Sequence, residues 1–277
     1  MPKYALLVGC NYLNVKGCTL NGCIDDIVNM SAALQRMGYL QENIVMLRDD
    51  KKEPKLLPTR ANILQQLQSL VEKSANAEEI WFHYSGHGSQ VVDRNRDEAS
   101  GMDSCICPLD FMDKGFIIDD DLFKIFSGSK CPTMILSDSC HSGTVCDLPY
   151  SIEYVRGNTY RYTRNNTATI ANPKVVMISG CKDWQTSADI YDNQAQEYAL
   201  SAAGYRGSLG QIYLGTMNWL RTNGFDQTPI LSSSAAIPTW SFGGSNVPPP
   251  PPPTSPQPTI VAPSAPRPKP SYRMVLI

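Results

Sequence analysis

The sequence lacks several features that mark common classes of protein. It has no block of lysine or arginine and a net charge of only −2, so neither nucleic acid nor a membrane surface is indicated as a principal partner. No Cys-x-x-Cys pair occurs and the three histidines form no paired motif, which disfavours structural zinc. We also expect no secretory signal, because an apolar strand is predicted at Tyr4–Val8, directly after the first residues.

Cysteines are frequent but odd in number, at nine in 277 residues. Without a secretory signal, this count favours reduced thiols and a cytoplasmic location over a disulfide framework. The composition, 42% hydrophobic and 18% charged, is ordinary for a globular protein of this length. We therefore expect one large catalytic domain followed by a tail.

Apolar runs alternate with amphipathic segments along the chain. Strands are predicted at Tyr4–Val8, Asn43–Leu47, Glu79–Tyr84, Thr133–Leu136 and Val175–Ile178. Helices are predicted at about 25–37, after an N-cap at Thr59, at about 120–126 and at about 209–220. This alternation predicts an α/β fold with a mostly parallel sheet, helices on both faces and ligands at the carboxyl ends of the strands.

Two of the predicted strands end next to reactive side chains. His87 follows the third strand between two glycines, and Cys140 follows the fourth strand among small and acidic residues. A thiol is only a few per cent thiolate at neutral pH, so a cysteine nucleophile gains from a histidine that takes its proton. An isolated pair would more often be a buried thiol and a loop histidine, but the matching strand ends predict a catalytic dyad.

The other two histidines are weaker candidates for the base. His83 lies inside an apolar strand, and His141 is adjacent to Cys140, where neighbouring side chains of an extended segment point to opposite faces. We therefore assign the role to His87.

The blocks around these two residues resemble those of the metacaspases, cysteine peptidases of the caspase-like clan. The blocks are Tyr84-Ser85-Gly86-His87-Gly88 and Asp138-Ser139-Cys140-His141-Ser142-Gly143. Their separation of 53 positions (140 minus 87) is close to the roughly fifty typical of caspases. Four further blocks match in order between about Lys3 and Ser234: Gly22–Asp26, Ser179–Asp183, Gln185–Asp189 and Leu231–Ser234. The resemblance implies a caspase-like α/β/α sandwich with a mostly parallel central sheet. Within the family, the chain resembles the type I metacaspases. We expect it to lack the N-terminal extension that many of these relatives carry.

This resemblance also implies a mechanism and a specificity. Cys140 attacks a peptide carbonyl, His87 protonates the leaving amine, and the backbone N–H groups of Gly88 and Cys140 hold the oxyanion. The positions that match the family's specificity pocket are Cys23, Asp26, Ser85 and Asp138, which implies cleavage after Arg or Lys. From the residues alone, Asp26 equally fits a role at the N-terminus of the following helix.

Acidic residues cluster in the middle of the chain. The segment from Asp93 begins like an EF-hand, but Glu98 stands where glycine is needed and Ser104 where glutamate is needed, so that motif fails. Many metacaspases bind calcium elsewhere, and the matching positions are Asp103, Asp119, Asp120 and Asp147. The resemblance therefore implies activating Ca²⁺ that stays outside the chemical step. A solvated acidic loop is the ordinary alternative.

Four regions are expected from these patterns. Residues 1–150 form a large-subunit-like catalytic region, and residues 151–173 an exposed linker loop with self-cleavage candidates Arg156, Arg161 and Arg164. Residues 174–245 form a small-subunit-like region that completes the same domain. Residues 246–277 form a disordered tail with twelve prolines from Pro248 onward, a spacer or a ligand for SH3- or WW-type partners.

Other functions stay open at this point. A catalytically idle scaffold that recruits partners through the tail is one, and a paracaspase- or legumain-like peptidase is another. Intact Cys140 and His87 argue against the scaffold, and the acidic pocket residues disfavour cleavage after Asp or Asn. The expected partners are protein or peptide substrates with an exposed Arg or Lys, and the expected oligomeric state is a monomer.

Overall fold

The computed structural model describes residues 1–92, 101–139, 146–156, 159–180, 207–222, 229–236 and 241–242. The chain divides into two compact units, 1–247 and 248–277, and the fold described below belongs to the first. No cis peptide bond occurs in the described residues. Among the helices that the structure describes, none combines the length and apolar character needed to cross a bilayer.

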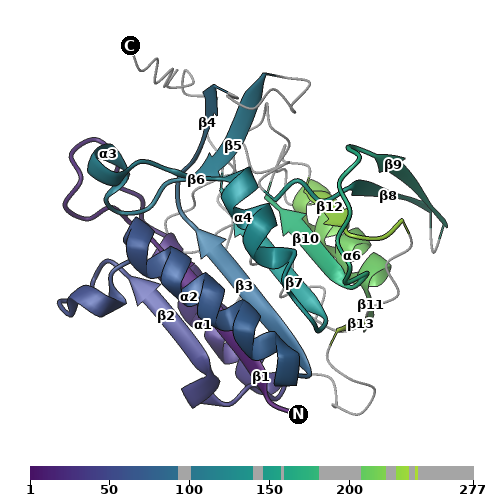
Figure 1. Cartoon of the computed structure of the whole chain (residues 1–277), viewed down its shortest axis with the longest axis horizontal. Helices are drawn as coiled ribbons and strands as arrows, with labels where there is room; N and C mark the ends of the chain where they lie inside the picture. The colour runs from purple at the N-terminus through teal and green to yellow at the C-terminus, as the bar shows by residue number, and fades with distance from the viewer. Residues whose placement is uncertain are drawn as a thin grey trace. The chain divides into compact units, whose positions relative to one another are not determined.

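An eight-stranded sheet forms the centre of the first unit, in the order β2-β1-β3-β7-β10-β12-β8-β9 (Figure 1). Its first five members pair in parallel. They are β2 (Ile44–Arg48), β1 (Lys3–Gly9), β3 (Glu79–Ser85), β7 (Thr133–Asp138) and β10 (Val175–Ser179). The sheet is therefore mostly parallel, as the sequence predicts.

The remaining three strands of the sheet are antiparallel. They are β12 (Ile230–Ser233), β8 (Tyr150–Arg156) and β9 (Thr159–Arg164). The prediction of an exposed loop over 151–173 is therefore wrong for its first part, where β8 and β9 form a hairpin. The tyrosines, threonines and Val155 favour extended structure, and Gly157-Asn158 between the two runs is a hairpin signal that the prediction did not use.

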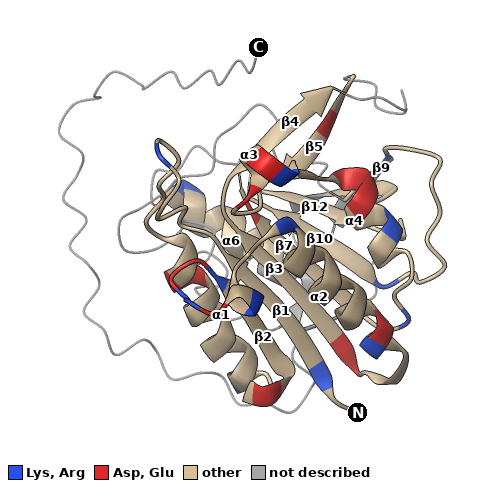
Figure 2. Ribbon diagram, turned by 60° about the vertical axis from the view of Figure 1, so that its left-hand side comes forward, with Lys and Arg blue, Asp and Glu red and all other residues tan. Residues whose placement is uncertain are grey.

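A smaller sheet lies beside the main one. It contains β4 (Gly88–Val92), β5 (Met102–Ile106) and β6 (Ile117–Ile118). A separate two-stranded sheet pairs β11 (Gly207–Ser208) with β13 (Ser241–Phe242). β5 and β6 are not among the strands predicted from the sequence, because acidic residues interrupt the apolar pattern there. Figure 2 shows acidic residues in β5 and at the start of α4 (Asp119–Phe126).

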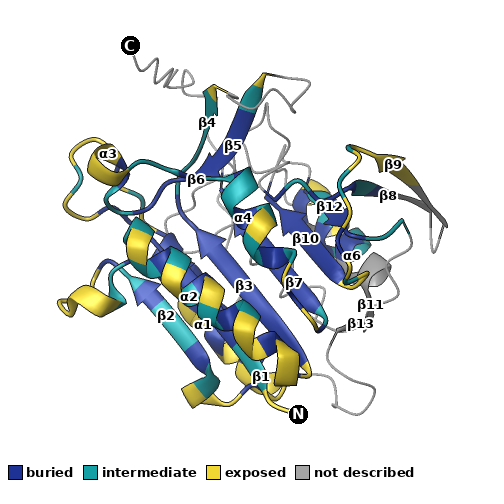
Figure 3. Ribbon diagram, in the orientation of Figure 1, coloured by how far each residue is buried: buried dark blue, intermediate teal, exposed yellow. Residues whose placement is uncertain are grey.

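Helices cover both faces of the main sheet. Alternate residues of β1 point to opposite faces, so Ala5 and Leu7 pack with α1 (Cys23–Arg36), whereas Leu6 and Val8 pack with α2 (Arg60–Lys73). α6 (Leu209–Thr222) joins the core on the α1 side, and α4 joins it on the α2 side. Figure 3 shows the central strands buried and the helices with one exposed face. The predicted sandwich is confirmed.

Local sequence signals set the ends of the two longest early helices. The Thr59 side chain accepts a hydrogen bond from the backbone N–H of Asn62 at 3.3 Å, which caps α2 as predicted. After α1, Gly38 adopts a φ of +90°, a left-handed conformation that glycine reaches without strain. Short helices complete the unit: α3 (Phe111–Lys114) and the 3₁₀ turns Gln41–Asn43, Pro54–Leu56 and Ser74–Asn76.

Candidate active site

The candidate site lies at the carboxyl ends of β3 and β7. These strands are parallel neighbours, and Ser85 at the end of β3 is the register partner of Asp138 at the end of β7. His87 follows Ser85 by two positions, and Cys140 follows Asp138 by two positions. Cys140 lies outside the described residues. The strand register therefore brings Ser85 and Asp138, which precede the two predicted catalytic residues, to one edge of the sheet.

The imidazole of His87 is held by a backbone carbonyl. Its Nε2 lies 2.7 Å from the carbonyl oxygen of Cys18, in the loop between β1 and α1. A carbonyl oxygen only accepts, so this contact requires the ring proton on Nε2 and leaves Nδ1 as the proton acceptor of the ring. A base oriented by a third group is the arrangement that an activated nucleophile needs.

Two buried tyrosines hold the backbone around His87. The N–H of His87 donates to the Tyr12 hydroxyl at 3.0 Å, and the Tyr84 hydroxyl donates to the carbonyl of His87 at 2.8 Å. The ring of Tyr12 also packs against the imidazole, with centroids 4.7 Å apart. The position of His87 is thus fixed through its backbone as well as through its ring.

The predicted specificity residues meet at the same edge. Asp26 in the first turn of α1 is fully buried, and its Oδ2 accepts a hydrogen bond from the Ser85 hydroxyl at 2.6 Å. Asp138 and Cys23 are also buried. Because the Asp26 carboxylate is bonded to β3, it does more than stabilise the start of its own helix. The structure therefore connects Asp26 to Ser85 and places Asp138 beside Ser85, whereas Cys23 lies in the same first turn of α1 as Asp26.

Gly88, a predicted oxyanion donor, is the first residue of β4 and lies opposite Ile106 of β5. The second predicted donor is the N–H of Cys140, outside the described residues. Gly88, one of the two predicted oxyanion donors, therefore lies directly after His87.

The acidic residues predicted for calcium lie in two elements and in the segment before β8. Asp103 lies in β5, Asp119 and Asp120 begin α4, and Asp147 has a left-handed φ of +42°. Asp119 is buried, and its carboxylate accepts from the N–H groups of Ser104 at 2.6 Å and of Asp120 at 3.0 Å. Within the described ranges, no three His, Cys, Asp or Glu side chains gather closely enough to hold a metal ion. The oxygen donors suit calcium, but the described side chains do not form a complete site.

A buried thiol lies near two of these carboxylates. Burial raises the pKa of Cys146, and the charges of Asp147 and Asp119 raise it further. Both carboxylates are therefore within electrostatic reach of one sulfur atom. Asp147 is the chain neighbour of Cys146, whereas Asp119 acts on it from a position 27 residues earlier (146 minus 119).

The self-cleavage candidates lie in the β8–β9 hairpin. Arg156 ends β8, Arg161 lies within β9 opposite Glu153, and Arg164 ends β9 opposite Tyr150. The guanidinium of Arg164 lies 6.0 Å from the centroid of the Tyr150 ring, and its Nε donates to the carbonyl of Asn166. These arginines are thus on paired strands and not on the predicted open loop.

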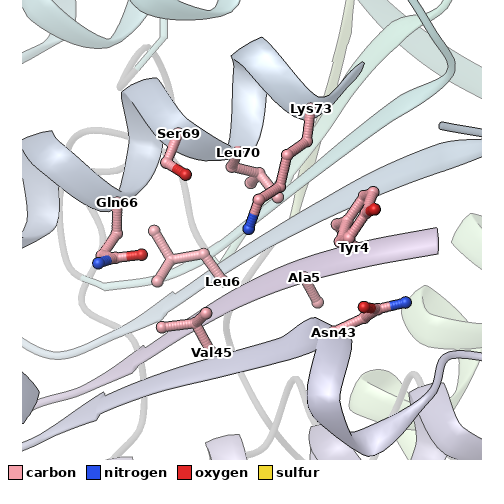
Figure 4. Close-up of a pocket in the computed structure, with 9 residues that line it drawn as sticks. All are labelled: Tyr4, Ala5, Leu6, Asn43, Val45, Gln66, Ser69, Leu70 and Lys73. Atoms are coloured by element: carbon pink, nitrogen blue, oxygen red, sulfur yellow. The ribbon is translucent and has the colours of Figure 1, made fainter. Parts of the chain in front are cut away.

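Several other candidate groups do not form sites. His83 is buried in the middle of β3, where desolvation lowers its pKa to about 3, so it stays neutral as a core residue. A narrow crevice between β1, β2 and α2 measures about 10 Å³, space for a single water molecule (Figure 4). The described cysteines are all buried: Cys10, Cys18, Cys23, Cys105, Cys107, Cys131 and Cys146.

Sequence reasoning missed three parts of the site. They are the Cys18 carbonyl, the Tyr12 hydroxyl, and the Asp49 carboxylate, which accepts from the N–H groups on either side of Tyr12. A backbone carbonyl has no residue signature, and a tyrosine after a strand fits a core position equally well. The Asp49-Asp50 pair at the end of the second predicted strand is the only signal that pointed there, because strand ends hold functional groups in such folds.

Comparisons with known proteins agree with this geometry. The family model described as "Metacaspase, peptidase C14 domain" matches residues 3–149. Metacaspase-1A of Aspergillus oryzae is 35% identical over 84% of this chain and 68% of its own length. Metacaspase-1 of Cryptococcus neoformans is 35% identical over 86% of this chain and 63% of its own length, so the chain spans about two thirds of such relatives.

Solved structures extend the comparison to the fold. A crystal structure of a Geobacter sulfurreducens protein has a TM-score of 0.60 and 25% identity, over 86% of this chain and 95% of that one. Caspase-1 from Spodoptera frugiperda has a TM-score of 0.52 and 11% identity, over 86% of this chain and 88% of that one. The second likeness shows the caspase-like fold. Together with the family match, these findings show that the chain belongs to the metacaspases, a family of cysteine-type endopeptidases.

Proposed function

We propose that this chain is a calcium-dependent endopeptidase that cleaves after Arg or Lys through a Cys140/His87 dyad. The observation that carries the proposal is the register of β3 and β7, which gives His87, the Asp26–Ser85 pair and Asp138 one common edge. A buried carboxylate next to a nucleophile favours a basic side chain in the substrate, because the cation and the anion neutralise each other away from water.

In the proposed reaction, the thiolate of Cys140 attacks the carbonyl carbon of the scissile peptide bond. The C–N bond breaks, the leaving amine takes a proton from the His87 imidazolium, and a thioester remains on the enzyme. Water then attacks the thioester, His87 accepts the proton of that water, and the acid product leaves with the thiol restored. The N–H groups of Gly88 and Cys140 are the proposed donors to the oxyanion.

The test uses paired fluorogenic peptides that end in Arg or in Asp. We expect the purified chain to release fluorophore from the Arg peptide and not from the Asp peptide, and Cys140→Ala or His87→Ala to abolish the release. Efficient hydrolysis of the Asp peptide would overturn the proposed specificity. No release under any condition would favour a scaffold whose tail recruits SH3- or WW-type partners.

Calcium is a separate part of the proposal. Asp103, Asp119, Asp120 and Asp147 are the residues that would hold it, and bound calcium would neutralise their charges and order this region. The support is the burial of Asp103 and Asp119 together with the shared neighbourhood of Asp119 and Asp147 around Cys146. We expect chelator to stop hydrolysis and Asp119→Ala with Asp120→Ala to remove the response to calcium. Asp113→Ala, which removes an exposed carboxylate on α3, is the matched control.

Self-cleavage after Arg156, Arg161 or Arg164 completes the proposal. Peptidases bind substrates as extended strands, and β9 is an extended strand at the edge of the sheet, paired on one side only with β8. Mass spectrometry after calcium addition would locate new termini. An intact chain that is fully active with calcium would show that self-cleavage is not required for activity.

A further inference from the structure

Tyr12 has a backbone conformation that is unusual for its side chain. Its φ is +53°, in the left-handed region, and only Asp147 shares a positive φ among the described residues other than glycine. The residue is also completely buried. A bulky side chain in this region is an outlier, and such strain persists only where the surrounding structure imposes it.

Asp49 imposes this conformation. Its Oδ1 accepts from the N–H of Asn11 and its Oδ2 accepts from the N–H of Leu13, both at 2.9 Å. One buried carboxylate at the end of β2 therefore binds the two amides that flank Tyr12. Charge-assisted hydrogen bonds of this kind are stronger than neutral ones, so they offset the strained torsion.

The strained conformation directs the Tyr12 hydroxyl to a group of backbone atoms. The oxygen accepts from the N–H of His87 at 3.0 Å, and its proton is donated to the carbonyl of Cys107 at 2.5 Å. The hydroxyl of Tyr84 lies 3.0 Å away and donates to the carbonyl of His87 at 2.8 Å. The N–H of Cys107 also donates to the carbonyl of His87, at 3.0 Å.

Donors and acceptors balance in this network. The two hydroxyls and the N–H groups of His87 and Cys107 supply four protons, and the two hydroxyls and the carbonyls of His87 and Cys107 supply the acceptor oxygens. Burial raises the pKa of Tyr12 and of Tyr84 well above the ordinary tyrosine value, so both hydroxyls stay protonated. A satisfied buried network is rigid, and removing one member leaves its partners unpaired.

The backbone directly before His87 packs closely against both tyrosines. A Cβ added at Gly86 would lie 2.7 Å from the Tyr84 hydroxyl and 3.1 Å from the Tyr12 hydroxyl. On the other side, the carbonyl of Cys18 holds Nε2 of the imidazole. Residue 87 is therefore fixed at its N–H, its carbonyl and its ring by groups from the 10–18 loop, β3 and the end of β5.

We propose that Tyr12, held in its left-handed conformation by Asp49 and paired with Tyr84, is a positioning residue that sets the location of His87 for proton transfer. The inference rests on the proposed role of His87 as the base. It extends that role to a residue 75 positions earlier in the chain (87 minus 12), which does not itself touch the reacting atoms.

The test compares three tyrosine-to-phenylalanine variants of the full chain. We expect Tyr12→Phe to lower kcat by about tenfold or more with KM for the Arg peptide within about twofold, since a small misplacement of a catalytic group slows the chemical step. The effect of Tyr84→Phe should be smaller, because Cys107 also donates to the carbonyl of His87. Tyr39→Phe, a buried tyrosine in the turn after α1, is the control and should leave both constants unchanged.

A second readout separates positioning from folding and from the proposed function. The amide proton of His87 should shift upfield in Tyr12→Phe, because it loses its acceptor, and should not shift in Tyr39→Phe. Asp49→Asn should lower kcat in the same direction without removing the hydroxyl. It serves as the second variant if Tyr12→Phe does not fold.

Three results would overturn the inference: equal kcat in Tyr12→Phe and Tyr39→Phe, a rise in KM alone, or an unmoved His87 amide. If the wild-type chain cleaves no peptide, or His87→Ala remains active, the proposed function fails instead. The amide shift then still decides whether Tyr12 positions residue 87.

Discussion

The parallel and antiparallel parts of the main sheet differ in burial and in the residues that they hold. Every residue of β3, β7 and β10 is buried, and the carboxyl ends of β3 and β7 lead to His87 and hold Ser85 and Asp138. In the antiparallel part, β9 lies at the sheet edge, where Tyr162 is 54% exposed. The candidate catalytic and specificity residues thus lie in the part of the sheet that helices cover on both faces. The arginines proposed for self-cleavage lie in the hairpin at the edge of the sheet.

The difference fits the division of tasks that the proposed function requires, with proton transfer in the parallel part and self-cleavage in the hairpin. Groups that transfer protons or bind an ionic side chain need fixed positions, which packed central strands supply. A segment that is itself to be cut needs an accessible, extended backbone, which an edge hairpin supplies. Substitutions in the parallel strands should therefore lower kcat/KM or the free energy of unfolding strongly. Substitutions in the β8–β9 hairpin should change them little.

The largest expected effect is on the proposed specificity residue Asp26. Asp26→Asn removes a buried charge that accepts from Ser85, so kcat/KM for peptides ending in Arg should fall by about 10² to 10³. Steady-state hydrolysis measures the change. Asp50→Asn, which removes a carboxylate at the surface that pairs with Arg48, is the control and should change kcat/KM less than about twofold. A similar loss in both variants would contradict the assignment.

The next effect is on stability and compares the centre of the sheet with its edge. Leu136→Ala in β7 should lower the free energy of unfolding by about 2–5 kcal/mol, because it leaves a cavity among packed side chains. Tyr162→Ala in β9 should change it by about 0.5 kcal/mol or less. Urea denaturation measures both. Equal losses would show that the hairpin is as much a part of the core as β7.

The last effect is absent at neutral pH and appears only on acidification. The pKa of His83 is lowered by burial from its ordinary 6.5 to about 3, so below pH 6.5 the unfolded chain binds a proton that the folded chain does not. The contribution of His83 to the free energy of unfolding is therefore fully present above about pH 6.5. It falls by about 1.4 kcal/mol per pH unit as the pH drops toward 3. His83→Leu should remove this part of the slope in denaturation curves. Parallel curves for wild type and variant would contradict the prediction.

Much of the parallel part follows from the sequence alone. Continuous apolar runs such as Thr133–Leu136 predict buried parallel strands, and the Thr59 cap and the alternating helices follow from standard signals. The strand ends then indicate where the site lies. The strand end predicts His87, and the family resemblance implies Asp26 and Ser85. The structure joins Asp26 to Ser85 two positions before His87.

The hairpin and the supports of His87 did not follow from the sequence, for different reasons. In β8 and β9 tyrosines alternate with polar residues on either side of Gly157-Asn158, a strand and hairpin signal that was overlooked because the segment is polar overall and resembles a loop in composition. The tyrosine network depends on the left-handed conformation of Tyr12, which two amides and a distant carboxylate impose. Such a long-range constraint leaves no local pattern.

Because the described thiols are buried, their chemical modification reports on unfolding of the core. Seven cysteines are shielded from solvent, and burial raises the pKa of several of them, including Cys131 to about 12. A neutral alkylating reagent modifies thiolates, so these side chains should react only when the core opens. Counting modified sulfurs over time, residue by residue, would therefore map which layers of the sheet open together.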